Sequence, residues 1–343
     1  MSAAPREAAG ASPDFVPPWR LRHHHVQTIY PSLPLRRAGV ERRASVLRQA
    51  SLEHIVDCGD GVRLLALVAT QLDAGRPPSD RLAVLLHGWE GSANSLYLLS
   101  LGQNLFDAGY DVVRLNLRDH GDSHHLNSGL FHSCRIAEVV GAVRELQRQH
   151  PGQRLVLAGF SLGGNFCLRV GARAAAAGIA VSRIVAVCPV IDPEHTLARL
   201  ETGWALYREY FVWKWRRSLR TKRAAWPDVY HSLDDILELG NLTEMTHRLA
   251  CGYGGFPSLP EYLRGYALVD RALEPLAALR DTRVRIIAAD DDPIIPAVDL
   301  ERIARSSVLT ITRTRYGGHC GFYDGVAGST WVERQVLASF ATG

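Results

Sequence analysis

Hydrophobic residues in this chain form short continuous runs, and most of these runs are separated by segments in which apolar and polar positions repeat with helical periodicity. Continuous apolar runs are typical of strands that are buried on both faces of a sheet. The first two runs, 52–58 and 62–70, flank the turn former Gly59-Asp60-Gly61, which predicts a hairpin. Strand and helix then alternate, and this order predicts a mainly parallel sheet covered by helices. The remaining predicted strands are 82–86, 111–117, 155–160, 184–188, 284–288 and 308–312, and the predicted helices are 95–108, 136–150, 162–178 and 331–340.

The strand run at 155–160 ends abruptly in the pattern G-x-S-x-G, centred on Ser161, and a helical pattern follows directly. A nucleophile elbow requires this context, because the serine must sit on a strained turn between strand and helix. Gly159 and Gly163 stand where side chains would collide in such a turn. We therefore predict that Ser161 is a catalytic nucleophile.

A serine hydroxyl needs a base to take its proton, and in this type of site an acid and then a histidine follow downstream. His319 follows the strand at 308–312 in the turn-like segment YGGHCGF, and it is the predicted general base. The acid comes from the run DDDPIIP, where three adjacent carboxylates cannot all be buried beside one imidazole. We favour Asp292, directly before Pro293, with Asp291 as the alternative.

An oxyanion hole needs one backbone N–H after the nucleophile and another from a loop that follows an earlier strand. Leu162 supplies the first, and Trp89 supplies the second from the loop that begins with His87-Gly88. We expect His87 to shape this loop rather than to act as a second base. Oxyanion loop, serine, aspartate and histidine occur in this order, each at a strand end, and together they predict an α/β-hydrolase fold.

The interval between 189 and 284 is far longer than a β-α-β connection requires. We expect a helical lid insertion there, after the sixth strand, from about 194 to 266. Trp204, Tyr207, Phe211 and Trp215 recur at helical spacing within it. They either bury the lid against the core or line an acyl-binding pocket, and Trp204, Tyr207 and Phe211 are the candidate substrate-binding residues.

A basic run in the same insertion comprises Lys214, Arg216, Arg217, Arg220, Lys222 and Arg223. We expect it to form a solvated helix face; peripheral contact with anionic lipid surfaces is the alternative. The net charge is only +4, and no base-reading motif accompanies the run, so nucleic-acid binding is not expected.

The chain has 343 residues, of which 47% are hydrophobic, which is enough for a large core. We expect residues 1–14 to be a disordered lead and 15–343 to form the hydrolase domain; without an apolar segment at the start or a long apolar run, no secretory signal or membrane span is expected. The six cysteines lack metal-ligand spacing, so we expect reduced core thiols. The consecutive histidines 23–25 give no defined metal geometry, and neither a metal nor a cofactor is predicted.

The opening PPWRLRHHHVQTIYPSL and the segments HGWEGSANSLY, NLRDHGDS, FHS, GFSLGGN, DDP and GGHCGF resemble the YheT-type α/β-hydrolases over nearly the whole chain from Phe15 onward. The resemblance implies carboxylic-ester hydrolysis, with a triad of Ser161, Asp292 and His319. It also implies a structural role for His25. The chain departs from the family pattern at Asp119 and Cys134, where glycine is usual.

These features predict a lidded serine esterase that cleaves short- to medium-chain acyl esters or acylglycerol-like lipids through an acyl-enzyme on Ser161. The alternatives are an acyltransferase that uses the same acyl-enzyme and a non-catalytic ligand-binding protein on the hydrolase scaffold. We expect a cytoplasmic protein; its oligomeric state does not follow from the sequence.

Overall fold

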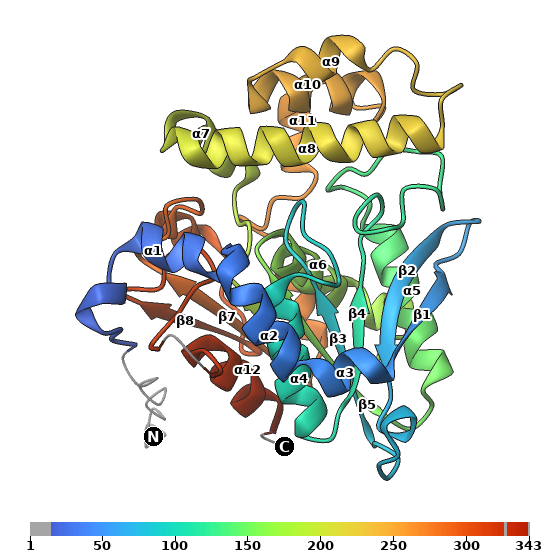
Figure 1. The fold of residues 1–343 in the computed structure, drawn as a ribbon, viewed down its shortest axis with the longest axis vertical. Coiled ribbons are helices and arrows are strands. Elements are labelled where there is room, and N and C mark those ends of the chain that lie inside the picture. Colours follow the sequence, from blue (N-terminus) through green and yellow to red (C-terminus); the bar gives the residue numbers. More distant parts are fainter. Residues whose placement is uncertain (1–14, 326–327, 342–343) are drawn as a thin grey trace, which may run out of the picture.

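An eight-stranded sheet forms the centre of the computed structural model, which describes residues 15–325 and 328–341 (Figure 1). The strand order is β1-β2-β4-β3-β5-β6-β7-β8. The hairpin of β1 and β2 is antiparallel, β2 pairs antiparallel with β4, and all other neighbours are parallel. The strands are β1 Ser51–Asp57, β2 Arg63–Ala69, β3 Arg81–Leu86, β4 Asp111–Leu115, β5 Arg154–Phe160, β6 Val181–Val187, β7 Arg283–Ala289 and β8 Leu309–Thr314. The predicted α/β-hydrolase architecture is confirmed. The lead expected at 1–14 lies outside the described residues.

Helices cover both faces of the sheet, because its central strands bury side chains on each side. Leu82, Val84 and Leu86 of β3 face the core under α5 (Ile136–Gln149) and α6 (Leu162–Ala177). The alternate residues Ala83 and Leu85 face the core under α4 (Leu96–Asp107) and α12 (Trp331–Ala341). The period of two along each strand therefore divides the core into two layers.

Three short N-terminal helices were not predicted: α1 His24–Ile29, α2 Arg37–Arg43 and α3 Ser45–Ala50. Few of their residues are buried, among them Val40, Leu47 and Ala50, so their sequence shows little apolar periodicity. α2 and α3 pack against α4 at the front of the sheet in Figure 1, and α1 reaches the carboxyl ends of the strands. The N-terminal segment is thus placed next to the predicted catalytic loops.

The long interval between β6 and β7 folds into five helices that lie above the carboxyl ends of the strands (Figure 1). They are α7 Pro193–Thr202, α8 Ala205–Ala225, α9 Asp234–Glu238, α10 Leu242–Gly252 and α11 Leu259–Arg264. The longest, α8, runs across the molecule beneath α9 and α10, between them and the sheet (Figure 1). Among all described residues, no helix is long and apolar enough to cross a membrane.

The basic run on α8 is not a uniformly solvated face, and this prediction is wrong for Lys222. That side chain is fully buried, and its Nζ donates to Asp119 Oδ1 at 2.7 Å and to the Asn127 carbonyl at 2.5 Å. A buried ammonium requires a counter-charge and acceptors, and the loop after β4 supplies both. Arg217 and Arg220, by contrast, are exposed.

Candidate active site

Ser161 lies on the sharp turn between β5 and α6, with a φ of 54°. Its N–H donates to the Val187 carbonyl at 2.8 Å, which fixes the turn against β6. The two flanking glycines are sterically required: a Cβ on Gly159 would lie 2.3 Å from the Gly163 oxygen, and one on Gly163 would lie 2.4 Å from the Leu86 oxygen. The turn therefore has the strained geometry of a nucleophile elbow.

The three adjacent aspartates after β7 have three different partners. Asp292 Oδ2 lies 2.8 Å from His319 Nδ1, and Asp292 Oδ1 accepts from two backbone N–H groups that follow it in the chain. Asp291 Oδ1 accepts from the Gly318 N–H at 2.8 Å, and Asp290 pairs with Arg313. Asp292, the favoured candidate, contacts the imidazole, while the alternative Asp291 holds the loop that carries it.

His319 is held from both sides. Its ring contacts Asp292, and its backbone N–H donates to Thr28 Oγ1 at 2.9 Å. Burial lowers the pKa of His319, but the charges of Asp292 and Cys320 outweigh burial and raise this pKa well above its usual value. An acid that orients the ring and stabilises its protonated form is what a general base on serine requires.

Ser161 and His319 line one cavity of about 610 Å³ between the sheet and the insertion. Among the described residues, no hydrogen bond joins their side chains, as is common in unliganded sites whose contacts tighten on substrate binding. Most of the wall is apolar, and residues of the N-terminal segment, of the oxyanion loop and of α7, α8 and α11 contribute to it. The cavity is of the size that takes a small molecule.

The two predicted oxyanion donors, Trp89 and Leu162, both line this cavity. In the described part of the chain, neither backbone N–H donates to another protein group, so both are free for a ligand. Gly88 lies against the elbow, since a Cβ there would be 3.2 Å from Ser161 Cβ. His87 has its Nδ1 at 2.7 Å from the Gly88 carbonyl, and its Nε2 accepts from the Leu117 N–H. With both ring nitrogens engaged, His87 is a loop-shaping residue, as expected.

Two of the three aromatic substrate-binding candidates in the insertion line the cavity, and the third does not. Tyr207 and Phe211 line the cavity, and Phe211 stacks on the Trp89 ring with centroids 5.1 Å apart. Trp204 is not among the lining residues; it precedes α8, is 47% exposed and packs on the His25 ring at 4.4 Å.

Several residues at the site escaped the sequence prediction. Gln27 is buried, and its amide bridges the N-terminal segment to Tyr323 through bonds to the Tyr323 carbonyl and N–H. The Thr28 hydroxyl accepts from the His319 backbone N–H. Gln27 and Thr28 both lie in the H-x-Q-T-I motif that carries part of the family resemblance. Glu90, beside Trp89, lines the cavity, and burial raises its pKa to about 8. No sequence signal marked Glu90.

Comparison with known proteins defines the class. A family model described as alpha/beta hydrolase fold matches residues 83–326, more than half of the chain. The chain therefore belongs to the alpha/beta-hydrolase family.

Two curated relatives narrow this class. The chain is 24% identical over 264 residues to "Putative esterase YheT" of Escherichia coli, and the alignment covers 74% of each protein. It is 23% identical over 267 residues to "Phospholipase ABHD3" of Mus musculus, where 75% of this chain matches 61% of the mouse protein. The match thus spans less than two thirds of the mouse protein. These relatives confirm the predicted resemblance to YheT-type hydrolases.

Solved structures with the same fold include an esterase of Pyrococcus furiosus, with a TM-score of 0.51 and 15% identity over 81% of this chain and 85% of the esterase. A membrane phospholipase A described as a bacterial virulence factor gives a TM-score of 0.55 and 16% identity over 92% of this chain and 93% of the other. At such low identity the likeness shows the fold alone.

Proposed function

We propose that this protein is a serine hydrolase of carboxylic esters that works through an acyl-enzyme on Ser161. His319 takes the proton of the serine hydroxyl as it attacks the ester carbonyl, and Asp292 orients the imidazole and stabilises its charged form. The Trp89 and Leu162 N–H groups stabilise the oxyanion. His319 then protonates the leaving alcohol and activates the water that releases the acid.

The observation that carries this proposal is the shared cavity, in which a serine on a strained elbow meets a histidine already bonded to a buried aspartate. A purely structural polar cluster would have no need for an elbow that costs backbone strain. The two unengaged N–H groups of Trp89 and Leu162 at the same wall supply the third requirement of acyl transfer.

The mostly apolar wall favours short- to medium-chain acyl esters or acylglycerol-like lipids as substrates. Tyr207 and Phe211 come from α8, so the insertion at about 194–266 acts as a lid that completes the acyl site. The relatives named as an esterase and as a phospholipase support an ester or lipid substrate.

The test is the initial rate of hydrolysis of p-nitrophenyl esters from acetate to palmitate, measured for the wild type and for Ser161→Ala. A fluorophosphonate probe is applied to both proteins in parallel. We expect turnover that peaks at short or medium chains, labelling of the wild type, and neither in the variant. A folded Ser161→Ala protein with undiminished turnover would refute the triad. Labelling without hydrolysis, but with acyl transfer to an added alcohol, would favour the acyltransferase alternative.

We also propose that an exposed stripe of α8, which begins at the rim of the cavity, contacts anionic lipid surfaces. Leu206, Tyr210 and Trp213 stand one helical turn apart on this stripe and are 47%, 43% and 54% exposed. Leu206 and Tyr210 also line the cavity, so the stripe connects the cavity with the surface. Arg217 and Arg220 continue the same stripe and are exposed. Apolar residues followed by cations match the boundary between acyl chains and anionic head groups.

The lipid contact is tested by co-sedimentation with vesicles. One set of vesicles is pure phosphatidylcholine, and in the other set about one third of the lipid is phosphatidylserine. We expect stronger binding to the anionic vesicles, weakened by Arg217→Gln/Arg220→Gln and by added salt. The matched control is Arg144→Gln, which removes an exposed arginine of α5, outside the insertion. Equal binding by both variants and the wild type would refute the assignment.

A further inference from the structure

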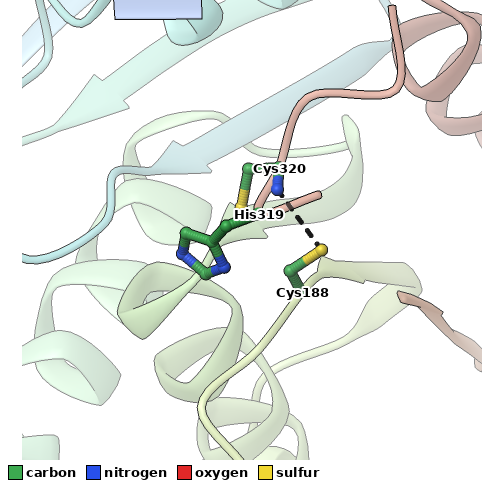
Figure 2. A group of neighbouring side chains, drawn as sticks. All are labelled: Cys188, His319 and Cys320. Atoms are coloured by element: carbon green, nitrogen blue, oxygen red, sulfur yellow. Dashed lines mark hydrogen bonds between the residues drawn. The ribbon is translucent and has the colours of Figure 1, made fainter. Parts of the chain in front are cut away.

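Cys188 and Cys320 are brought together beside His319, although their positions in the chain differ by 132. Cys188 follows the end of β6, and Cys320 follows the histidine in its loop. Figure 2 shows both cysteine side chains beside His319, with the Cys188 sulfur directed toward the Cys320 backbone nitrogen. The two Sγ atoms and one ring nitrogen of His319 all lie within 4.8 Å of one another.

Each thiol is held against the segment that carries the other. The Cys320 N–H donates to Cys188 Sγ at 3.4 Å (Figure 2). The Cys188 thiol donates to the Gly318 carbonyl at 3.8 Å, and the Cys320 thiol donates to the Val187 carbonyl at 3.7 Å. These contacts fix the pair in place, so its proximity is built into the fold.

The two sulfur atoms differ in access and in charge. Cys320 lines the cavity, whereas Cys188 is 1% exposed and does not. Burial raises the pKa of Cys320, but the hydrogen bond with Cys188 and the charge of His319 outweigh burial and lower this pKa below its usual value. Burial raises the pKa of Cys188 well above its usual value. An accessible thiolate next to a buried thiol is the arrangement of an attacking and a resolving cysteine.

We propose that Cys320 and Cys188 form a redox-modification site, at which a hydroperoxide converts the two thiols to a disulfide and thereby stops hydrolysis. The effect on hydrolysis rests on the proposed function; the disulfide itself does not. Nδ1 of His319 is already engaged by Asp292, and for this reason we assign the reactivity to the thiols rather than to a bound metal.

The chemistry balances in two steps. The Cys320 thiolate attacks the terminal oxygen of the hydroperoxide, an S–OH bond forms as the O–O bond breaks, and the leaving alkoxide takes a proton to become an alcohol. The Cys188 sulfur then attacks the sulfenic sulfur, an S–S bond forms, and the hydroxyl leaves as water with the Cys188 proton. The two thiols lose two electrons, and the hydroperoxide gains them.

Disulfide formation must disturb the catalytic loop. A disulfide has an S–S distance of about 2.0 Å, and the two sulfur atoms have to close to that separation. Cys320 is bonded covalently to His319 and has a φ of 62°, and Cys188 has a φ of 43°, so neither backbone has much freedom to adjust. A displacement of about 1 Å at a catalytic group costs on the order of 100-fold in rate. We therefore expect at least a ~10-fold loss of activity on oxidation.

The experiment treats the reduced, desalted protein with tert-butyl hydroperoxide. Free thiols are blocked with N-ethylmaleimide, and peptides are mapped by mass spectrometry without reduction. Hydrolysis of a p-nitrophenyl ester is measured before treatment, after treatment and after dithiothreitol. We expect a Cys188–Cys320 cross-linked peptide, the loss of activity given above, and recovery with dithiothreitol.

Two variants sharpen the result. Cys188→Ala removes the resolving thiol, so we expect no cross-link and an inactivation that dithiothreitol does not fully reverse, because the Cys320 sulfenic acid oxidises further. Cys251→Ser, a half-buried cysteine on α10, is the matched control and should behave like the wild type.

Inactivation without the Cys188–Cys320 peptide would overturn the proposal, as would a cross-link that leaves the rate unchanged. Reduced protein that hydrolyses no ester would count against the proposed function instead, and the peptide map would still decide whether the thiol pair is oxidised.

Discussion

The buried ion pair between Lys222 of α8 and Asp119 offers a sharp quantitative test, because it ties the insertion to the core. The side chains are 1% and 5% exposed, and the Nζ–Oδ1 distance is 2.7 Å. The ammonium also donates to the backbone carbonyls of Asn127 and Gly129, and Asp119 Oδ2 accepts from the Phe131 N–H. Lys222→Met keeps most of the length of the side chain and leaves the carboxylate buried without its counter-charge.

Removing one partner of a buried ion pair costs about 3 to 5 kcal/mol, because the remaining charge loses its compensation. The upper part of this range applies here, since Lys222 donates to two carbonyl groups as well as to the carboxylate. Urea unfolding of a chain of this size has an m-value of about 3 kcal/mol/M, so the midpoint should fall by ~1.3 to 1.7 M.

The stability lost in Lys222→Met should depend on pH in a definite direction. Burial already raises the pKa of Asp119, and Lys222 opposes this rise. Without Lys222 the folded state binds the Asp119 proton still more tightly than the unfolded state, so stability falls as pH increases from the unfolded to the folded pKa. The cost of Lys222→Met should therefore be largest at neutral pH and shrink in acid.

The measurement is urea unfolding followed by tryptophan fluorescence and circular dichroism, for the wild type, Lys222→Met and the double variant Asp119→Asn/Lys222→Met. The double variant removes the orphaned charge and keeps an acceptor for the Phe131 N–H, so we expect it to regain at least about 2 kcal/mol over Lys222→Met. A cost below about 1 kcal/mol for the single variant, or equal costs for the two variants, would refute the reasoning.

Three further outcomes follow from the structure. Asp292→Asn should lower kcat by about 10⁴ with little change in KM, because the amide favours the wrong tautomer of His319; steady-state kinetics checks this. Cys320→Ser should shift the acid limb of the pH profile of kcat/KM to lower pH, since the active base is neutral and Cys320 raises the His319 pKa; an unmoved limb would contradict it. Gly141→Ala should lower the free energy of unfolding by about 1 to 3 kcal/mol, because its Cβ would lie 1.9 Å from a backbone carbonyl; thermal unfolding checks this. The control is Gly39→Ala on α2, whose Cβ meets only a side-chain nitrogen at 3.8 Å and which should be stabilising.

The sheet and the elbow could be predicted from sequence because their physical causes are local. A strand buried on both faces needs a continuous apolar run, and β3, β5 and β7 each lie within about one residue of the predicted bounds. The elbow needs two glycines at fixed offsets from Ser161, and the clashes at Gly159 and Gly163 show why. Such signals lie within a few residues of one another, so one segment is enough to detect them.

The N-terminal helices and the support of the His319 loop could not be predicted in the same way. Gln27 and Thr28 act through hydrogen bonds to residues almost 300 positions away, with sequence separations of 296 and 291. Nothing in α1 itself indicates these partners, because a buried glutamine and a threonine are compatible with many environments. The same applies to Cys188 and Cys320, which looked like isolated core thiols in the sequence.

Asp119 is an unusual residue whose role depends on a partner far away in the sequence. The position has a φ of 57°, a conformation in which glycine carries no steric cost, which accounts for the glycine of the family pattern. Aspartate tolerates this region better than most residues, but here it also brings a charge into the interior. Lys222, 103 residues later, neutralises that charge. The acid and the base are each costly alone and stable only together, so the departure at 119 and the buried lysine on α8 are best understood as one feature that fastens the insertion to the loop after β4.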